Sequence, residues 1–230
     1  MLATAIRTAA ASHRISAIPI GRLEMTTALA ALERIGLVLS LERDATVFFE
    51  GGDAKSYFKV SRGIIRNCTL LSDGRRFISD FYLSGNFFGL TGEGQNLCSA
   101  EAVTAVTLVR WTRKSVAGLA ERHPGVAKCL RLMVNDDIAA AQEHMLLLGR
   151  KDATEKVASF LLMMADRGGD SHRASLPMTR LDIADYLGLT IETVSRTVTE
   201  LRSRRLIRLQ DSHDVILVNR GAIEELANAA

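Results

Sequence analysis

The sequence predicts an α+β chain with an antiparallel β-roll, a long helix and a C-terminal winged helix-turn-helix. Three observations predict this order of elements. Glycines recur every eleven residues in the first half of the chain, apolar residues then recur at spacings of three and four, and two short amphipathic helices joined by a tight turn follow. Each pattern has its own period, which is typical of three separate structural regions.

The evenly spaced glycines predict the β-roll. Gly52, Gly63, Gly74 and Gly85 are eleven residues apart, and the third of them completes an Asp-Gly pair, which is a strong hairpin signal. The segments between them are rich in aromatic and β-branched residues, as half-buried strands are. Short strands with regular turns are typical of an antiparallel roll or barrel. The expected strands are Tyr57–Val60, Ile64–Leu71 and Phe77–Leu83.

Composition and hydropathy bound the class of protein. The chain has 230 residues, of which 47% are hydrophobic and 24% charged, and this is ordinary globular chemistry. The longest apolar run covers about nine residues, 157–165, well short of the ~20 needed to cross a bilayer. Arg7, His13 and Arg14 interrupt the alanine-rich start, so we expect no signal peptide and a cytoplasmic protein. The expected regions are a mobile extension over residues 1–23, the β-roll with its leading helix over 24–112, a dimerisation helix region over 113–149, and the winged helix-turn-helix over 150–230.

A helical stripe of apolar residues follows the predicted roll. Such a stripe either packs on the roll or pairs with its twin in a second subunit, and periodicity alone does not separate the two. A helix-turn-helix protein usually needs two copies to cover two half-sites ~34 Å apart, which favours a homodimer. After a hinge at residues 149–152, we expect the first helix of the C-terminal domain over residues 153–166. The stripe consists of Leu130, Val134, Ile138, Ala141, Met145 and Leu148.

Residues 179–205 carry the most informative motif, the helix-turn-helix. Ala184 is small enough for a second helix to approach the first, and Gly188 can take the left-handed conformation that the turn requires. Thr190 offers an N-cap oxygen to the second helix. The first helix carries apolar Leu181, Ile183 and Leu187, the second buries Val194, Val198 and Leu201, and the strand-like segments 206–209 and 215–218 predict a wing.

The polar face of the second helix suits a major groove. Arginine reads guanine and glutamate accepts from cytosine, and both residue types stand near the start of this helix. Arginines are also concentrated after it, and such local positive charge is typical of phosphate binding. The expected base-reading residues are Ile191, Glu192, Ser195 and Arg196. The expected phosphate contacts are Thr179, Arg180, Thr190, Thr193, Arg202 and Arg205.

With these residues identified, the chain resembles the cyclic AMP receptor protein and fumarate-nitrate reduction regulator superfamily of bacterial transcription factors. The resemblance covers about residues 30–226 and is most specific at residues 57–63, 81–90 and 187–196. Its recognition-helix residues are most similar to the nitrogen-fixation regulators of the FixK type. The resemblance implies a palindrome of TTGAT and ATCAA separated by four bases, with Glu192 and Arg196 on the G·C pair and Ser195 on the outer thymines.

Departures from the family pattern concern the signal. Cyclic-nucleotide binders of this family hold ribose and phosphate with a glutamate and an arginine, and here Leu90 and Cys98 take those places, the latter before Ser99. Neither residue can serve as such an anchor, so cyclic AMP is disfavoured. No cysteine precedes Cys68, which argues against the iron-sulfur cluster of the oxygen-sensing member.

The resemblance therefore implies a DNA-binding activator of low-oxygen, nitrogen-oxide or nitrogen-fixation genes, and we expect no cofactor or metal. Its activity would be set by synthesis or by oxidation of Cys68, Cys98 or Cys129. A haem-dependent nitric oxide sensor of the same superfamily is the alternative, although His144 reads as an exposed or satisfied residue rather than a haem ligand. The sequence has no catalytic constellation, so we expect no enzyme. By resemblance, the DNA-bound dimer would contact RNA polymerase through roll loops such as residues 71–74.

Overall fold

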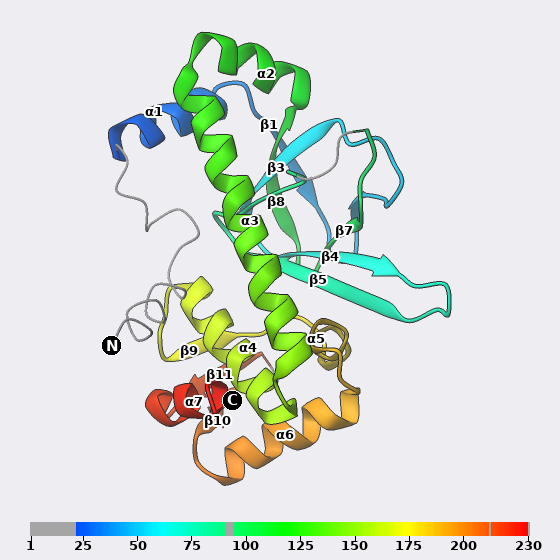
Figure 1. Ribbon diagram of the computed structural model, residues 1–230, viewed down its shortest axis with the longest axis vertical. Coiled ribbons are helices and arrows are strands. Elements are labelled where there is room, and N and C mark those ends of the chain that lie inside the picture. Colours follow the sequence, from blue (N-terminus) through cyan, green and yellow to red (C-terminus); the bar gives the residue numbers. More distant parts are fainter. Residues whose placement is uncertain (1–21, 91–93, 212, 230) are drawn as a thin grey trace. The chain divides into compact units, whose positions relative to one another are not determined.

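The computed structural model describes residues 22–90, 94–211 and 213–229, which form two compact units that divide between Ala140 and Ala141. The predicted extension over residues 1–23 lies outside the described residues as far as residue 21. The first unit holds α1 (Arg22–Glu33), β1 (Leu37–Leu41), β2 (Thr46–Phe48), β3 (Ser56–Arg62), β4 (Ile65–Leu70), β5 (Arg76–Tyr82), β6 (Phe87–Phe88), β7 (Ser99–Ala102), β8 (Val106–Thr112) and α2 (Arg113–Arg122). α3 (Pro124–Arg150) runs through both units as one continuous helix (Figure 1).

The first unit is the predicted antiparallel roll. Its strands form two four-stranded sheets, in the orders β1-β8-β3-β6 and β2-β7-β4-β5. Gly63, Gly74 and Gly85 have positive φ angles, as the predicted turns require, but in the first repeat Gly51 rather than Gly52 takes this conformation. The roll also includes β1, which lies before the first predicted strand.

Aromatic side chains fill the inside of the roll. The Phe58 and Phe88 rings are stacked with centroids 5.0 Å apart, and Tyr82 lies 5.5 Å from Phe88. Phe48 packs against Phe58 at 5.7 Å. Aliphatic residues such as Ile65 and Leu108 complete this core and are fully buried. The two sheets are therefore held together by hydrophobic packing, the main favourable term in folding.

The helical region expected over residues 113–149 consists of two helices in the structure, α2 and α3. Thr112 caps α2, whose chain leaves the helix at His123. Pro124 then begins α3, since proline lacks the N–H that a first helical residue does not use. Within the part of the chain that the structure describes, no helix is long and apolar enough to span a membrane.

The second unit combines the last turns of α3 with a winged helical domain. α4 begins as predicted, because Asp152 forms a capping box with Glu155. α4 packs against α6, α7 and β9. The sheet order is β10-β11-β9, so the predicted two-stranded wing has a third strand that the sequence analysis missed. The remaining elements are α4 (Ala153–Gly168), β9 (Arg173–Ser175), α5 (Arg180–Leu187), α6 (Ile191–Ser203), β10 (Ile207–Leu209), β11 (Asp214–Leu217) and α7 (Arg220–Ala227).

Candidate nucleic-acid interface

Local hydrogen bonds fix both ends of the turn between α5 and α6. Thr179 and Asp182 form a capping box at the start of α5. Gly188 ends α5 with φ 60° and ψ 40°, the left-handed conformation that the sequence predicted. The Thr190 hydroxyl accepts from the Thr193 backbone N–H at 3.2 Å, which confirms it as the N-cap of α6.

The buried face of α6 orients its polar face outward. Val194, Val198 and Leu201 are buried as predicted, and Thr197 is buried with them, which the sequence analysis missed. On α5, Leu181 is 51% exposed, so it is not part of the core that Ile183 and Leu187 enter. The reason is helical periodicity, because Leu181 lies about 160° around the helix from Ile183, given 100° per residue.

The predicted reading face, defined as Ile191, Glu192, Ser195 and Arg196, is exposed as a group. Ile191 is 39% exposed at the first position of α6. Neither Glu192 nor Arg196 forms an ion pair with another residue that the structure describes. Their polar groups are therefore open to a ligand on one face of one helix.

The predicted phosphate contacts surround the reading face in sequence, and most are exposed. Thr179, Thr190, Arg202 and Arg205 are exposed, and Thr193 is half-buried. Arg205 has a φ angle of 57°, which costs a non-glycine residue about 1–2 kcal/mol. Its backbone N–H donates to Arg202 O and that of Leu206 donates to Leu201 O, the bond pattern of a Schellman motif, in which glycine is usual at this place.

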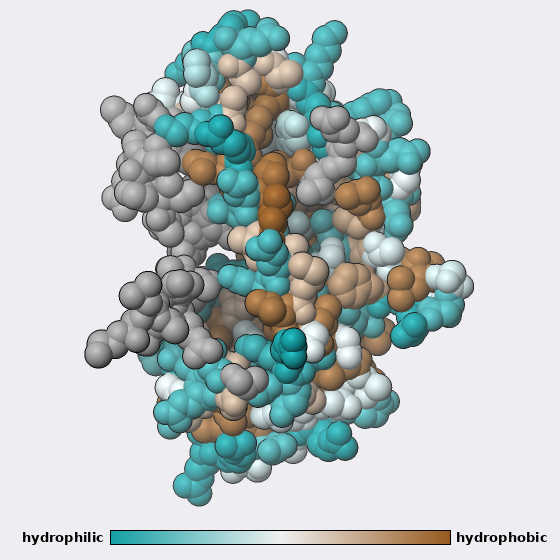
Figure 2. Space-filling view, viewed as in Figure 1, coloured by the Kyte–Doolittle hydropathy of each residue, from teal (hydrophilic) through white to brown (hydrophobic). Residues whose placement is uncertain are grey.

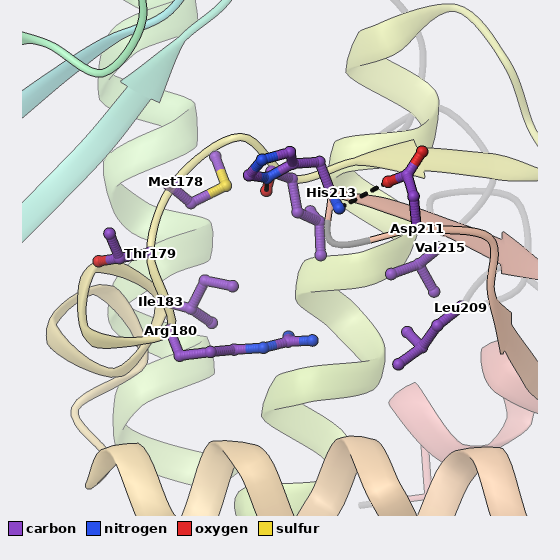
Figure 3. A pocket seen from close by; sticks show the side chains of 9 residues that line it. Met178, Thr179, Arg180, Ile183, Leu209, Asp211, His213 and Val215 are labelled. Atoms are coloured by element: carbon purple, nitrogen blue, oxygen red, sulfur yellow. Dashed lines mark hydrogen bonds between the residues drawn. The ribbon is translucent and has the colours of Figure 1, made fainter. Parts of the chain in front are cut away.

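Arg180 differs from these residues because its guanidinium lies in a pocket. The pocket has a volume of about 160 Å³ and is also lined by Leu209, Val215 and His213 of the wing. Figure 3 shows the Arg180 side chain extended across it past Ile183 toward Leu209. Burial lowers the pKa of the Arg180 guanidinium below its ordinary value. The side chain remains a cation, partly withdrawn from solvent between α5 and the wing.

An ion pair ties the third strand to the wing. Arg173 of β9 bonds the Asp214 carboxylate of β11, and this bond lowers the pKa of Asp214. The strands pair over Asp214 to Ile216. The wing hairpin is therefore anchored to the chain segment that leads into α5.

The α3 stripe, defined as Leu130, Val134, Ile138, Ala141, Met145 and Leu148, is only partly covered by the chain. Ile138 is 49% and Met145 64% exposed, whereas Cys129 and Met133 on a neighbouring face are buried. Hydrophobic side chains are visible at intervals along α3 in Figure 2. Leu148 is half-buried, and its Cδ2 lies 3.4 Å from the place that a Cβ at Gly188 would take. The stripe thus leaves apolar surface uncovered over its central residues, Ile138, Ala141 and Met145.

The roll does not fit a cyclic nucleotide. Leu90 is 8% exposed and offers no acceptor for ribose hydroxyls. Burial raises the pKa of the Cys98 thiol to about 11, so this thiol is neutral near pH 7 and cannot pair with phosphate. Ser99 already accepts the Glu50 backbone N–H at 2.9 Å. Both polar anchors of such a pocket are therefore missing.

The cysteine and histidine side chains are the candidate ligands for an iron-sulfur cluster or haem. Burial also raises the pKa of Cys68 and Cys129 to about 11. Among the described residues, no three His, Cys, Asp or Glu side chains are grouped to hold a metal ion. His144 is buried, and its Nε2 donates to the Tyr186 carbonyl oxygen at 2.7 Å. This ring is satisfied by the protein, as the sequence analysis expected of it.

Comparison with known proteins places these features in a family. The Crp-like helix-turn-helix domain matches residues 155–226, and the cyclic nucleotide-binding domain matches residues 38–123. The nitrogen fixation regulation protein FixK of Rhizobium meliloti (strain 1021) is 38% identical over 192 residues, which cover 84% of this chain and 88% of that protein. FixK of Azorhizobium caulinodans is 42% identical over 198 residues, covering 84% of this chain and 79% of that protein.

Comparison with solved structures gives the same family. The structure of FixK2 from Bradyrhizobium japonicum superposes with a TM-score of 0.81 at 37% identity, covering 85% of this chain and 99% of that one. These relatives are transcription regulators and not enzymes. The chain therefore belongs to the Crp/Fnr family of transcription regulators, and it is FixK-like in both sequence and fold.

Proposed function

We propose that this regulator is a sequence-specific activator that binds, without cyclic nucleotide, to TTGAT and ATCAA half-sites separated by four bases. The observation that carries this proposal is the exposed reading face of α6, whose Glu192 and Arg196 have no ion-pair partner among the described residues. Arg196 would donate to guanine O6 and N7, and Glu192 would accept from cytosine N4. Ser195 would contact the outer thymines, and Ile191 would pack against a thymine methyl group.

Phosphate contacts would fix the register of α6 in the groove. Exposed Arg202 and Arg205 lie at and just after the end of α6, and Thr190 and Thr193 lie at its start. Thr179 caps α5 and Arg180 is its first residue, so both lie where the partial positive charge of the helix N-terminus would attract a phosphate. These residues would bind any sequence alike.

A homodimer would be formed along α3. The α3 stripe leaves Ile138 and Met145 exposed at helical spacing, and a second copy of the same stripe would cover them. Two subunits would then present two α6 helices to successive major grooves.

The bound dimer would act in the cytoplasm by contacting RNA polymerase. The β4–β5 hairpin exposes Leu70 to 70% and Leu71 to 41%, and this apolar tip is a candidate contact. The similarity to nitrogen fixation regulators supports target genes of nitrogen fixation, nitrogen-oxide or low-oxygen metabolism.

Fluorescence anisotropy of the purified protein, in air and with a metal chelator, tests the proposal. We expect tight binding to the palindrome and at least tenfold weaker binding to a duplex with both G·C pairs swapped, since each wrong base pair costs about 1–3 kcal/mol. Equal affinity for both duplexes would contradict it. Discriminating binding gained only on adding haem, with a Soret band, would support the haem-dependent alternative instead.

A further inference from the structure

His144 links the end of α3 to the helix-turn-helix within the second unit. Its imidazole ring is stacked on the Tyr186 ring with centroids 4.1 Å apart and an interplanar angle of 7°. Its Nε2–H donates to the Tyr186 backbone carbonyl at 2.7 Å. Both residues are buried, at 7% and 3% exposure. One side chain of α3 therefore contacts α5 through a stack and a hydrogen bond at once.

The carbonyl that His144 binds belongs to the last turn of α5. A helix leaves its last carbonyls without backbone partners. At this end, the backbone N–H groups of Gly188 and Leu189 both donate to Ala184 O. The Tyr186 carbonyl receives the imidazole instead, so a residue of α3 caps the helix that leads into the turn.

Tyr186 is itself held by α4. Its ring lies 5.6 Å from that of Phe160, and its hydroxyl donates to Met163 Sδ at 3.4 Å. His144 therefore contacts a side chain that packing against α4 already holds in place.

The neighbouring residues of α3 face solvent. Ala141 and Gln142 are exposed, and Met145 is 64% exposed. Met145 follows His144 at about 100° around the helix. The same two turns of α3 therefore hold the helix-turn-helix on one face and carry part of the α3 stripe on another.

We propose that His144 is a positioning residue that sets the half-site spacing the dimer accepts. This inference rests on the proposed function, because it requires the α3 stripe to pair. With α5 capped by His144, the angle between the paired helices and α6 is fixed, and with it the separation of the two reading faces. Without that contact, α6 would still fit one major groove, but the second half-site could lie at several separations.

A series of palindromes with spacers of three to six bases tests this proposal by fluorescence anisotropy. His144→Phe keeps a stacking ring and removes the donor, and His144→Gln keeps a donor and removes the stack. His144→Phe leaves the buried Tyr186 carbonyl unsatisfied, which is costly, so the contact that holds α5 against α3 should weaken. We therefore expect the preference of this variant for the four-base spacer to fall about tenfold. Its affinity for random DNA and its salt dependence should equal those of the unaltered protein.

A control separates positioning from general damage. Gln142→Ala alters an exposed neighbour of His144 on α3. It should keep the spacer preference. Should His144→Phe not fold, His144→Gln decides: it loses the stack on Tyr186, so its preference for the four-base spacer should also fall, and an unchanged preference would overturn the proposal.

An unchanged spacer profile in the His144 variants would overturn the proposal, as would equal losses on random DNA. Failure of the proposed function is distinguishable, because the unaltered protein would then not prefer the palindrome over its G·C-swapped form at any spacing.

Discussion

The inside of the roll and the outer face of α6 use their side chains in opposite ways. In the roll, Phe58, Tyr82 and Phe88 are buried and pack their rings together, and Leu90 offers no polar anchor for a nucleotide. On the reading face of α6, Glu192 and Arg196 are exposed and have no ion-pair partner among the described residues. The roll has the fold of a nucleotide-binding domain but an apolar interior, whereas α6 exposes side chains that can form hydrogen bonds with base edges. This contrast supports the proposal that DNA recognition does not depend on a ligand in the roll.

Phe88→Ala should have the largest effect, a loss of stability in the roll that leaves DNA discrimination by α6 unchanged. Phe88 is fully buried, and such a truncation costs about 3–5 kcal/mol of unfolding free energy. Urea denaturation followed by circular dichroism measures the loss. Phe49→Ala is the matched control, because Phe49 is 69% exposed and its removal should change stability by less than about 0.5 kcal/mol. The comparison fails if the folded Phe88→Ala protein no longer discriminates between the palindrome and its swapped form.

Arg196→Ala should act on DNA and leave stability unchanged. We expect a loss of about 1–3 kcal/mol on the palindrome and relaxed specificity at the G·C pair, because the proposed bidentate contact to guanine would be lost. Anisotropy with matched and swapped duplexes measures both. Arg204→Ala is the control, since Arg204 lies beyond the reading face and pairs with Glu200 at 3.7 Å. Equal losses on specific and random DNA for Arg196→Ala would show that this arginine binds phosphate.

Arg205→Gly should raise stability and lower DNA affinity together. Glycine relieves the left-handed backbone at φ 57°, which we expect to stabilise the protein by about 1 kcal/mol. Loss of a phosphate contact should weaken binding to all sequences and reduce the salt slope by about 1. Arg205→Ala is the matched variant, with the same loss on DNA and no gain in stability. Unchanged DNA affinity in both variants would remove Arg205 from the phosphate contacts.

The smallest expected effect is on the reactivity of the three cysteine thiols, which decides whether oxidation can control the protein. Folding raises the pKa of Cys68, Cys98 and Cys129 from 9.0 to about 11. The folded state therefore holds these protons more tightly, and the stabilisation is complete below about pH 9 and lost as pH rises through about 11. Because the thiolate is the reactive form, alkylation by iodoacetamide at about pH 8 should be slower in the native protein than in urea. Fast alkylation of Cys98 in the native protein would show that its thiol is reactive and would support control by oxidation.

The features that the sequence predicted correctly are those set by neighbours in the chain. Ala184, Gly188 and Val194 define the helix-turn-helix because a turn and two helix faces depend on spacing alone, and the structure confirms them. Asp152 and Thr190 are caps that act within three residues. Exposure of the reading face followed from the same helical period.

The features that the sequence analysis missed depend on distant parts of the chain. Strand β9 has three residues and exists because it pairs with β11, about forty residues later. His144 looks like any polar residue of an exposed helix until the fold places Tyr186 beside it.

The central claim, that α6 reads DNA without a ligand in the roll, is tested most directly by measuring one affinity under several conditions. The dissociation constant for the palindrome would be determined by anisotropy for the protein as purified, and again after adding cyclic AMP or haem. We expect discriminating binding at the outset and no change on either addition. Binding that becomes specific, or strengthens more than about tenfold (1.4 kcal/mol), only after an addition would contradict the claim.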